Sequence, residues 1–191
     1  MTRSMLAATF LALASLSMVA PARADNYSET IQLFKDAGES REFFGKSYGY
    51  AVFPNIGKGG LGIGGAYGKG RVYAGGVAVG ETSMTQLSFG FQAGGQGYSL
   101  IIFFEDKRSF EEFTSGNFEF GAQASAVAIT AAASAGAGTT GTTAGASGGK
   151  SDATTRGDFY KGMAQFIIIK GGAMYEATIA GAKFSYKPLK K

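Results

Sequence analysis

The run from Lys46 to Gly70, KSYGYAVFPNIGKGGLGIGGAYGKG, constrains the fold of this chain more than any other segment. It begins with aromatic and aliphatic residues, passes a single proline and then becomes dense in glycine. Glycine allows positive φ and close approach of the backbone to other groups, but it weakens a strand or helix that it interrupts. No stable helix would use the glycine-dense half, so we expect strands from Tyr48 onward.

Strand patterns continue along the chain. In Thr85–Ala93, apolar residues that include Leu87 alternate with polar or glycine positions that include Gln86, as in a half-buried antiparallel strand. Tyr98–Phe104 is apolar on both faces, which predicts a central strand. The remaining strand candidates are Phe118–Ile129, Met163–Ile169 and Ala173–Tyr186.

Two segments have helical spacing. Ser28–Lys46 predicts an amphipathic helical region that Gly38 interrupts. Its charged face either covers a core from the solvent side or meets lipid headgroups. Asp106–Asn117 predicts a short helix or a loop across a sheet edge. The expected fold is therefore mainly β, an antiparallel closed or nearly closed barrel or sandwich with a short N-terminal helical region, an α+β arrangement being possible.

Residues 1–24 have the pattern of a secretory signal peptide. Arg3 gives a positive start, Met5–Val19 is uncharged and apolar or small, and Ala22-Arg23-Ala24 fits the small-x-small cleavage pattern before Asp25. The alternative is a retained anchor, but the apolar run is shorter than the ~20 residues of a bilayer span. Cleavage near Ala24–Asp25 predicts a periplasmic or cell-envelope protein, with secretion also possible, and one domain over residues 25–191.

One segment of that domain differs in composition. Apart from Lys150, Asp152 and Arg156, residues 130–157 are only Gly, Ala, Ser or Thr. Such residues bury too little apolar surface to offset the entropy of ordering them. We expect a mobile loop inside the domain; a membrane span is the alternative, but the composition disfavours it.

The composition excludes several classes of chemistry. The chain has no His and no Cys, so Ser-His or Cys-His nucleophilic catalysis is impossible and a zinc site would lack its preferred ligands. The carboxylate pairs Glu105-Asp106 and Glu111-Glu112 fit a solvated face better than a glycosidase. We therefore expect no enzyme activity, catalytic residue, metal or cofactor.

The sequence also disfavours nucleotides and nucleic acids as ligands. Gly57–Gly62 fits the bare G-x-G-x-x-G pattern, but a dinucleotide site needs a helix there, and a P-loop needs Ser or Thr after its lysine. The net charge is +4, and it falls to +2 when Arg3 and Arg23 leave with the signal peptide. The cations are scattered, whereas a nucleic-acid binder carries a basic stripe or cluster.

The Lys46–Gly70 run, together with SFGFQAGGQGYSLIIFF at Ser88–Phe104 and FEFGAQASAVAI at Phe118–Ile129, resembles the SYLF family. This lipid-binding domain is shared by bacterial exported proteins and by eukaryotic membrane and actin-patch proteins, the yeast Las17-binding proteins among them. The resemblance implies binding to acidic phospholipids. Some eukaryotic relatives also act on actin, which is not expected in a bacterial envelope.

The predicted function is therefore binding of an anionic phospholipid or membrane surface. Tyrosine rings suit headgroup depth and cations suit phosphates. The alternatives are a small outer-membrane β-barrel and a structural envelope protein that acts through protein partners, which the sequence does not identify. The candidate lipid-binding residues are Lys35, Arg41, Lys46, Tyr48, Lys58, Tyr67, Lys69 and Arg71.

Overall fold

A computed structural model of the protein describes residues 26–61, 63–89, 94–121, 126–129, 158–172 and 179–190. The predicted signal peptide at 1–24 and the small-residue segment at 130–157 lie outside these residues.

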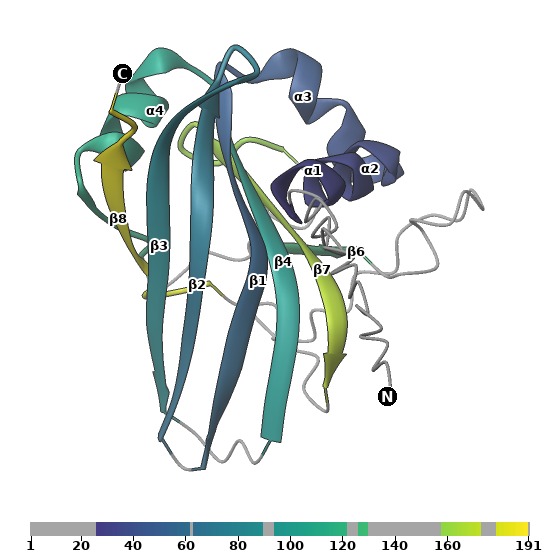
Figure 1. The fold of residues 1–191 in the computed structure, drawn as a ribbon, viewed down its shortest axis with the longest axis vertical. Helices are drawn as coiled ribbons and strands as arrows, with labels where there is room; N and C mark the ends of the chain where they lie inside the picture. The colour runs from purple at the N-terminus through teal and green to yellow at the C-terminus, as the bar shows by residue number, and fades with distance from the viewer. Residues whose placement is uncertain are drawn as a thin grey trace, which may run out of the picture.

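Eight strands form one sheet in the order β5-β8-β3-β2-β1-β4-β7-β6 (Figure 1). Neighbouring strands are antiparallel except for β6 and β7, which are parallel. The strands are β1 (Gly49–Leu61), β2 (Ile63–Ala74), β3 (Val77–Phe89), β4 (Gly94–Phe104), β5 (Asn117–Glu119), β6 (Val127–Ile129), β7 (Met163–Gly172) and β8 (Lys183–Pro188).

The helices lie toward one end of this sheet, and the long strands β1 to β4 continue beyond them (Figure 1). We call the part of these four strands farthest from the helices the lower half, as it is drawn in Figure 1. It comprises residues 57–61, 63–67, 85–89 and 94–97. The helices are α1 (Asn26–Asp36), α2 (Gly38–Arg41), α3 (Phe43–Lys46) and α4 (Lys107–Thr114).

The inner face of the sheet carries the larger apolar core. Phe53, Leu100 and Phe104 are fully buried there. α4 contributes Phe113, whose ring centroid lies 4.8 Å from that of Phe104 and 5.3 Å from that of Phe184 on β8. Burying a Phe or Leu side chain contributes roughly 1.5–3 kcal/mol, so this cluster holds α4 against the inner face.

The outer face is covered by α1 to α3 in its upper part. Phe34 and Phe43 are buried in a second cluster with residues of β4 and β7. The Phe43 ring centroid lies 5.6 Å from that of Phe103 and 4.9 Å from that of Phe166. The Ser40 hydroxyl donates to the Phe34 carbonyl over 2.5 Å and ties α2 to α1. The N-terminal helical region therefore covers the upper part of the outer face.

A bulge in β1 decides which side chains face inward. The register of β1 shifts between Val52 and Asn55 against β2, and the carbonyl of Pro54 accepts a 2.7 Å hydrogen bond from the Ser99 hydroxyl. As a result Phe53 and Ile56, three residues apart, both lie in the inner core. Continuing the alternation from Ile56 places Lys58 on the inner face as well.

The two glycines of β2 opposite this bulge are required by packing. A Cβ on Gly70 would lie 2.6 Å from the Phe53 ring, and one on Gly68 would lie 2.5 Å from the Ile56 Cγ1. Both large side chains occupy the space that a side chain on β2 would need. Some glycines of the run are thus needed to make room for its buried aliphatic and aromatic side chains.

The predicted mainly β, antiparallel fold with an N-terminal helical region is confirmed. The sheet is not closed, however: among the described residues its ladder ends at β5 and β6, which do not pair with each other. Both end strands have three residues, and so short an edge offers little template for pairing with another chain.

The predicted elements differ from the observed ones in places. Tyr98–Phe104 lies in the central strand β4, Met163–Ile169 lies in β7, and the predicted helix after Asp106 is α4. The predicted strand Phe118–Ile129 is instead divided between β5 and β6, with residues 122–125 outside the described part. Of the last predicted strand, β8 is described from Lys183 and residues 173–178 are not.

The contact between Gly70 and Phe53 gives a direct test of this packing. Gly70→Ala should destabilise the fold by roughly 1–3 kcal/mol, because overpacking forces a buried ring to move. Gly57→Ala is the matched control, since a Cβ at Gly57 on the neighbouring strand would meet nothing within 4 Å. Urea unfolding of the two variants measures the difference, and equal stabilities would contradict the described register.

Candidate functional site

The lower half of the sheet has apolar side chains outside and polar side chains inside. Leu87 is 74% exposed and Ile63 is 66% exposed, both on the outer face, whereas Gln86 and Lys58 on the inner face are each 4% exposed. The sequence prediction that Leu87 belongs to the buried face of its strand and Gln86 to the exposed face is therefore wrong. The reason is that β3 follows the register of β2, which the buried upper residues fix.

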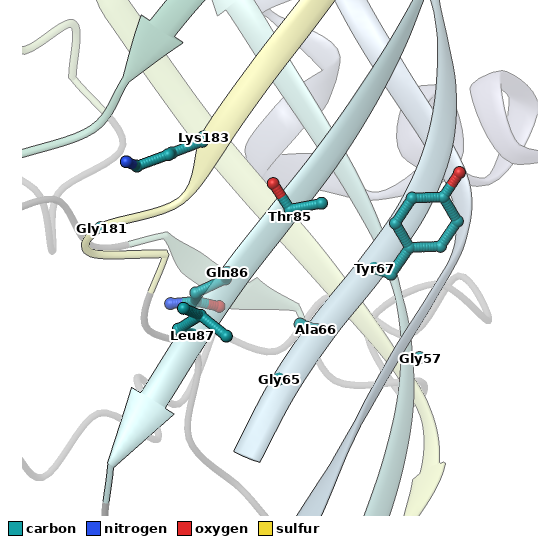
Figure 2. A pocket seen from close by; sticks show the side chains of 9 residues that line it. All are labelled: Gly57, Gly65, Ala66, Tyr67, Thr85, Gln86, Leu87, Gly181 and Lys183. Carbon is teal, nitrogen blue, oxygen red and sulfur yellow. The ribbon is translucent and has the colours of Figure 1, made fainter. Parts of the chain in front are cut away.

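Three apolar or aromatic side chains and two lysines make up what we call the outer patch. Tyr67 on β2 is opposite Thr85 on β3, and Thr85 is opposite Lys183 on β8. Figure 2 shows these three side chains on adjacent strands. Gly65, the next outer position of β2, is opposite Leu87. The outer patch comprises Ile63, Tyr67, Lys69, Leu87 and Lys183.

Glycines form the floor of this patch. On β1, Gly57 is opposite Tyr67 of β2. Gly59, also on β1, is opposite Gly65 of β2 and Gly95 of β4. A pocket of about 330 Å³ lies beside Tyr67 and Leu87 and extends to Ala66, Gln86 and Gly181 (Figure 2). Because the glycine positions carry no side chains, Ile63, Tyr67 and Leu87 project beyond the neighbouring backbone and are accessible to a partner.

A second pocket lies on the other side of Tyr67. Its volume is about 280 Å³, and its lining includes Asn26 and Tyr27 at the start of α1 together with Asn55, Tyr67 and Lys69. Tyr67, which is 52% exposed, thus separates two hollows of the outer surface. A ring in this position offers both an apolar body and a hydroxyl to a bound molecule.

The cations around the outer patch differ in how they are held. Among the described residues no ion pair involves Lys69, whereas Lys183 forms an exposed ion pair of 3.5 Å with Glu119. The Lys170 ammonium donates over 2.8 Å to the Asn55 side chain. The Arg71 guanidinium lies 4.2 Å from the centroid of the Tyr27 ring. An exposed ion pair such as that between Lys183 and Glu119 is weak, so Lys183 remains available to an anion.

The inner face of the lower half carries a row of buried polar side chains. Lys58 on β1 is opposite Gln96 on β4, and on its other side it is opposite Ala66, which is opposite Gln86 on β3. Within the described part of the chain, neither the Lys58 ammonium nor the Gln96 amide has a hydrogen-bond partner. Burial raises the pKa of the nearby Tyr98 phenol, which therefore stays protonated at neutral pH.

The structure brings together only some of the predicted lipid-binding residues. Tyr67, Lys69 and Arg71 follow one another on the outer face of β2. Lys58 was expected to be an exposed cation of the same group, but it is buried on the opposite face. The β1 bulge is the physical reason, because it moves Lys58 into the inward set of the pleat.

The other four predicted residues lie elsewhere. The Lys35 ammonium is 5.5 Å from the centroid of the Phe44 ring, and Arg41 donates to the Lys35 carbonyl over 2.8 Å. Lys46 forms a 2.7 Å ion pair with Glu42. Tyr48 precedes β1, at the end of the sheet remote from Tyr67, and its ring lies 5.3 Å from that of Phe110. These residues do not belong to the outer patch.

Sequence reasoning missed Ile63, Leu87 and Lys183 on the outer face and Gln86 and Gln96 on the inner face. A period-two reading of β1 that allowed for a bulge at Pro54 would have indicated the inward position of Lys58. The outward position of Leu87 has no comparable local signal, because only the pairing of β3 with β2 fixes it.

The described residues show no sign of two other kinds of site, a membrane-spanning helix and a metal centre. No helix in the described part of the chain is long and apolar enough to cross a bilayer. Over the same residues, no group of three or more His, Cys, Asp or Glu side chains is placed to hold a metal ion.

Comparison with known proteins gives the family. The family model Ysc84, described as Las17-binding protein actin regulator, matches residues 85–185, which is more than half of the chain. The chain belongs to this family. The SYLF resemblance seen in the sequence is thereby confirmed, and the match includes Leu87, Gln96 and Lys183 of the lower half.

One curated relative extends the comparison. Beta cell expansion factor A of Aeromonas veronii is 29% identical to this chain over 161 residues, which cover 81% of the chain and 51% of that protein. The chain thus spans about half the length of this curated relative.

The reversed polarity of β3 can be tested by a pair of substitutions. Leu87→Gln should change the free energy of unfolding by no more than about 0.5 kcal/mol, as is usual for an exposed position. Leu100→Gln should lower it by at least about 2 kcal/mol, because Leu100 is fully buried. Chemical denaturation checks both. A loss at Leu87 as large as that at Leu100 would show that Leu87 is inside.

Proposed function

We propose that this chain is an exported, non-enzymatic protein that binds the surface of anionic membranes through its outer patch. The observation that carries the proposal is the reversed polarity of the lower half of the sheet, with Ile63, Tyr67 and Leu87 outside and Lys58 and Gln96 inside. Exposed apolar side chains grouped on one surface mark an interaction site.

The mixture of residues in the outer patch favours a membrane interface as its partner. Leu87 and Ile63 can enter the boundary between headgroups and acyl chains, and Tyr67 suits headgroup depth. Lys69 and Lys183 lie on the same face and can reach lipid phosphates. Each cation near an anionic surface contributes about 1 kcal/mol, so binding would be weak, reversible and sensitive to salt.

Export and the lack of catalysis are the other parts of the proposal. The sequence of residues 1–24 supports export, and the absence of His and Cys from the chain removes the usual nucleophile–base pairs. The same apolar surface could instead receive a protein, which is the second candidate. The lysines at the rim favour an anionic surface over a neutral apolar partner.

Cosedimentation with liposomes tests the proposal. The protein should bind vesicles of phosphatidylcholine and phosphatidylglycerol more strongly than vesicles of phosphatidylcholine alone. Raising salt from 0.1 M to 1 M should remove the difference, because the Debye length falls from about 10 Å to about 3 Å. Lys69→Gln with Lys183→Gln should weaken binding about 10- to 30-fold, which corresponds to two cations near the surface.

Three controls complete the experiment. Lys187→Gln with Lys190→Gln changes the net charge equally but acts on exposed residues at the end of β8 and beyond it, so it should have the smaller effect. Leu87→Gln should weaken binding without unfolding the protein. If anionic lipid is not preferred at low salt, or if both lysine pairs have equal effects, the outer patch is not a membrane-binding surface.

A further inference from the structure

The inner face of the lower half holds a buried cation for which the described residues offer no counter-charge. The Lys58 side chain is 4% exposed and its ammonium has no hydrogen-bond partner among them. A buried charge is normally paired or hydrogen-bonded, because burial removes it from water. Lys58 therefore needs a partner that the described part of the chain does not provide.

The neighbours of Lys58 have the same property. Gln96 is directly opposite Lys58, which places the two Cβ atoms about 5 Å apart. Gln96 is also 4% exposed, and neither its amide nitrogen nor its amide oxygen is hydrogen-bonded within the described residues. The hydroxyl of Tyr98, two residues along the same strand, is buried without a partner too. Buried groups of this kind are rare in folded proteins, and several together call for an explanation.

A pocket lies on the outer side of the strands that carry this row. The 330 Å³ pocket of Figure 2 is lined by Ala66 and Gln86, and Ala66 is the residue of β2 directly opposite Lys58. Its volume lies at the lower end of the range for small-molecule sites. Its lining also includes Tyr67 and Leu87 from the outer patch, whereas Lys58, Gln96 and Tyr98 do not line it.

We propose that Lys58, Gln96 and Tyr98 form an internal binding site for an oxyanion, a phosphate or carboxylate group. The Lys58 ammonium neutralises the charge, and the Gln96 amide nitrogen and the Tyr98 hydroxyl donate hydrogen bonds to the oxygens. Ala66, directly opposite Lys58 on β2, presents only a methyl group there. The oxyanion can come from free phosphate or from the headgroup of a single-chain amphiphile, and the probes of the test distinguish the two sources.

This site is separate from the outer patch. The side chain of Lys58 lies on the inner face and that of Lys69 on the outer face, so one can be changed without the other. The internal site can therefore be present whether or not the protein binds membrane surfaces, and separate variants test the two proposals.

Ligand-dependent thermal stability and calorimetry test the internal site. The probes are dodecyl phosphate and dodecanoate below their micelle concentrations, inorganic phosphate, and neutral dodecyl maltoside. Dodecyl phosphate and dodecanoate should raise the Tm of the protein, because a ligand that binds the folded state stabilises it, and dodecyl maltoside should not. Protection by inorganic phosphate equal to that by dodecyl phosphate would keep the oxyanion site and identify its ligand as free phosphate.

Variants show whether Lys58 is responsible. Lys58→Met should weaken dodecyl phosphate binding about 10- to 100-fold, the effect of losing hydrogen bonds to a charged group. The same variant should raise the Tm of the ligand-free protein, because an apolar side chain of similar length replaces a buried charge. Lys107→Met, at an exposed position of α4, should change neither quantity.

Further variants keep the test decisive if Lys58→Met does not fold. Gln96→Leu retains the cation and should also weaken dodecyl phosphate binding, whereas Lys69→Gln should leave it unchanged. Liposome binding should be retained in Lys58→Met, which separates this proposal from the membrane one. The internal site is refuted if no anionic probe protects the wild-type protein, or if the protection persists in both Lys58→Met and Gln96→Leu.

Discussion

The alternation of side chains along β1, shifted once by the bulge at Pro54–Asn55, determines which residues of this strand face the core and which face outward. Above the bulge, Phe53 faces inward and belongs to the core. Below it, Ile56 and Lys58 take the inward positions, and Gly57 and Gly59 take the outward ones. The neighbouring strands β2 and β4 keep an unbroken alternation past this point, so the bulge changes the inward set of β1 alone and matches its lower half to them.

The two ends of the sheet consequently have different physical roles. At the upper end, rings of α4, β5 and β8 meet on the inner face, as in the contact between Phe113 and Phe184, and α1 to α3 cover the outer face with Phe34 and Phe43. This part supplies the apolar burial that stabilises the fold. It can therefore hold the lower half in a pattern that would be costly by itself, with Leu87 in solvent and Lys58 buried.

Much of the architecture could be predicted from local patterns. Strands such as Tyr98–Phe104 and the helical region before Lys46 have clear periodicity, and the family resemblance rested on motifs that are visible in the sequence. The predicted site was less accurate, because Lys58 was grouped with Lys69 from their positions in the same glycine-rich run. Their separation onto opposite faces depends on one bulged residue, and the outward position of Leu87 depends on pairing with another strand. Neither constraint is local, so single-sequence reasoning could not include them.

The central claim, that the outer face of the lower half contacts lipid, can be measured at a single position. The chain contains no cysteine, so Leu87→Cys provides a unique site for an environment-sensitive fluorophore such as NBD. With vesicles containing phosphatidylglycerol, the label at Leu87 should shift to shorter wavelength and brighten, whereas a label at Glu111→Cys on α4 should not change. No change at Leu87, or equal changes at both positions, would contradict the account.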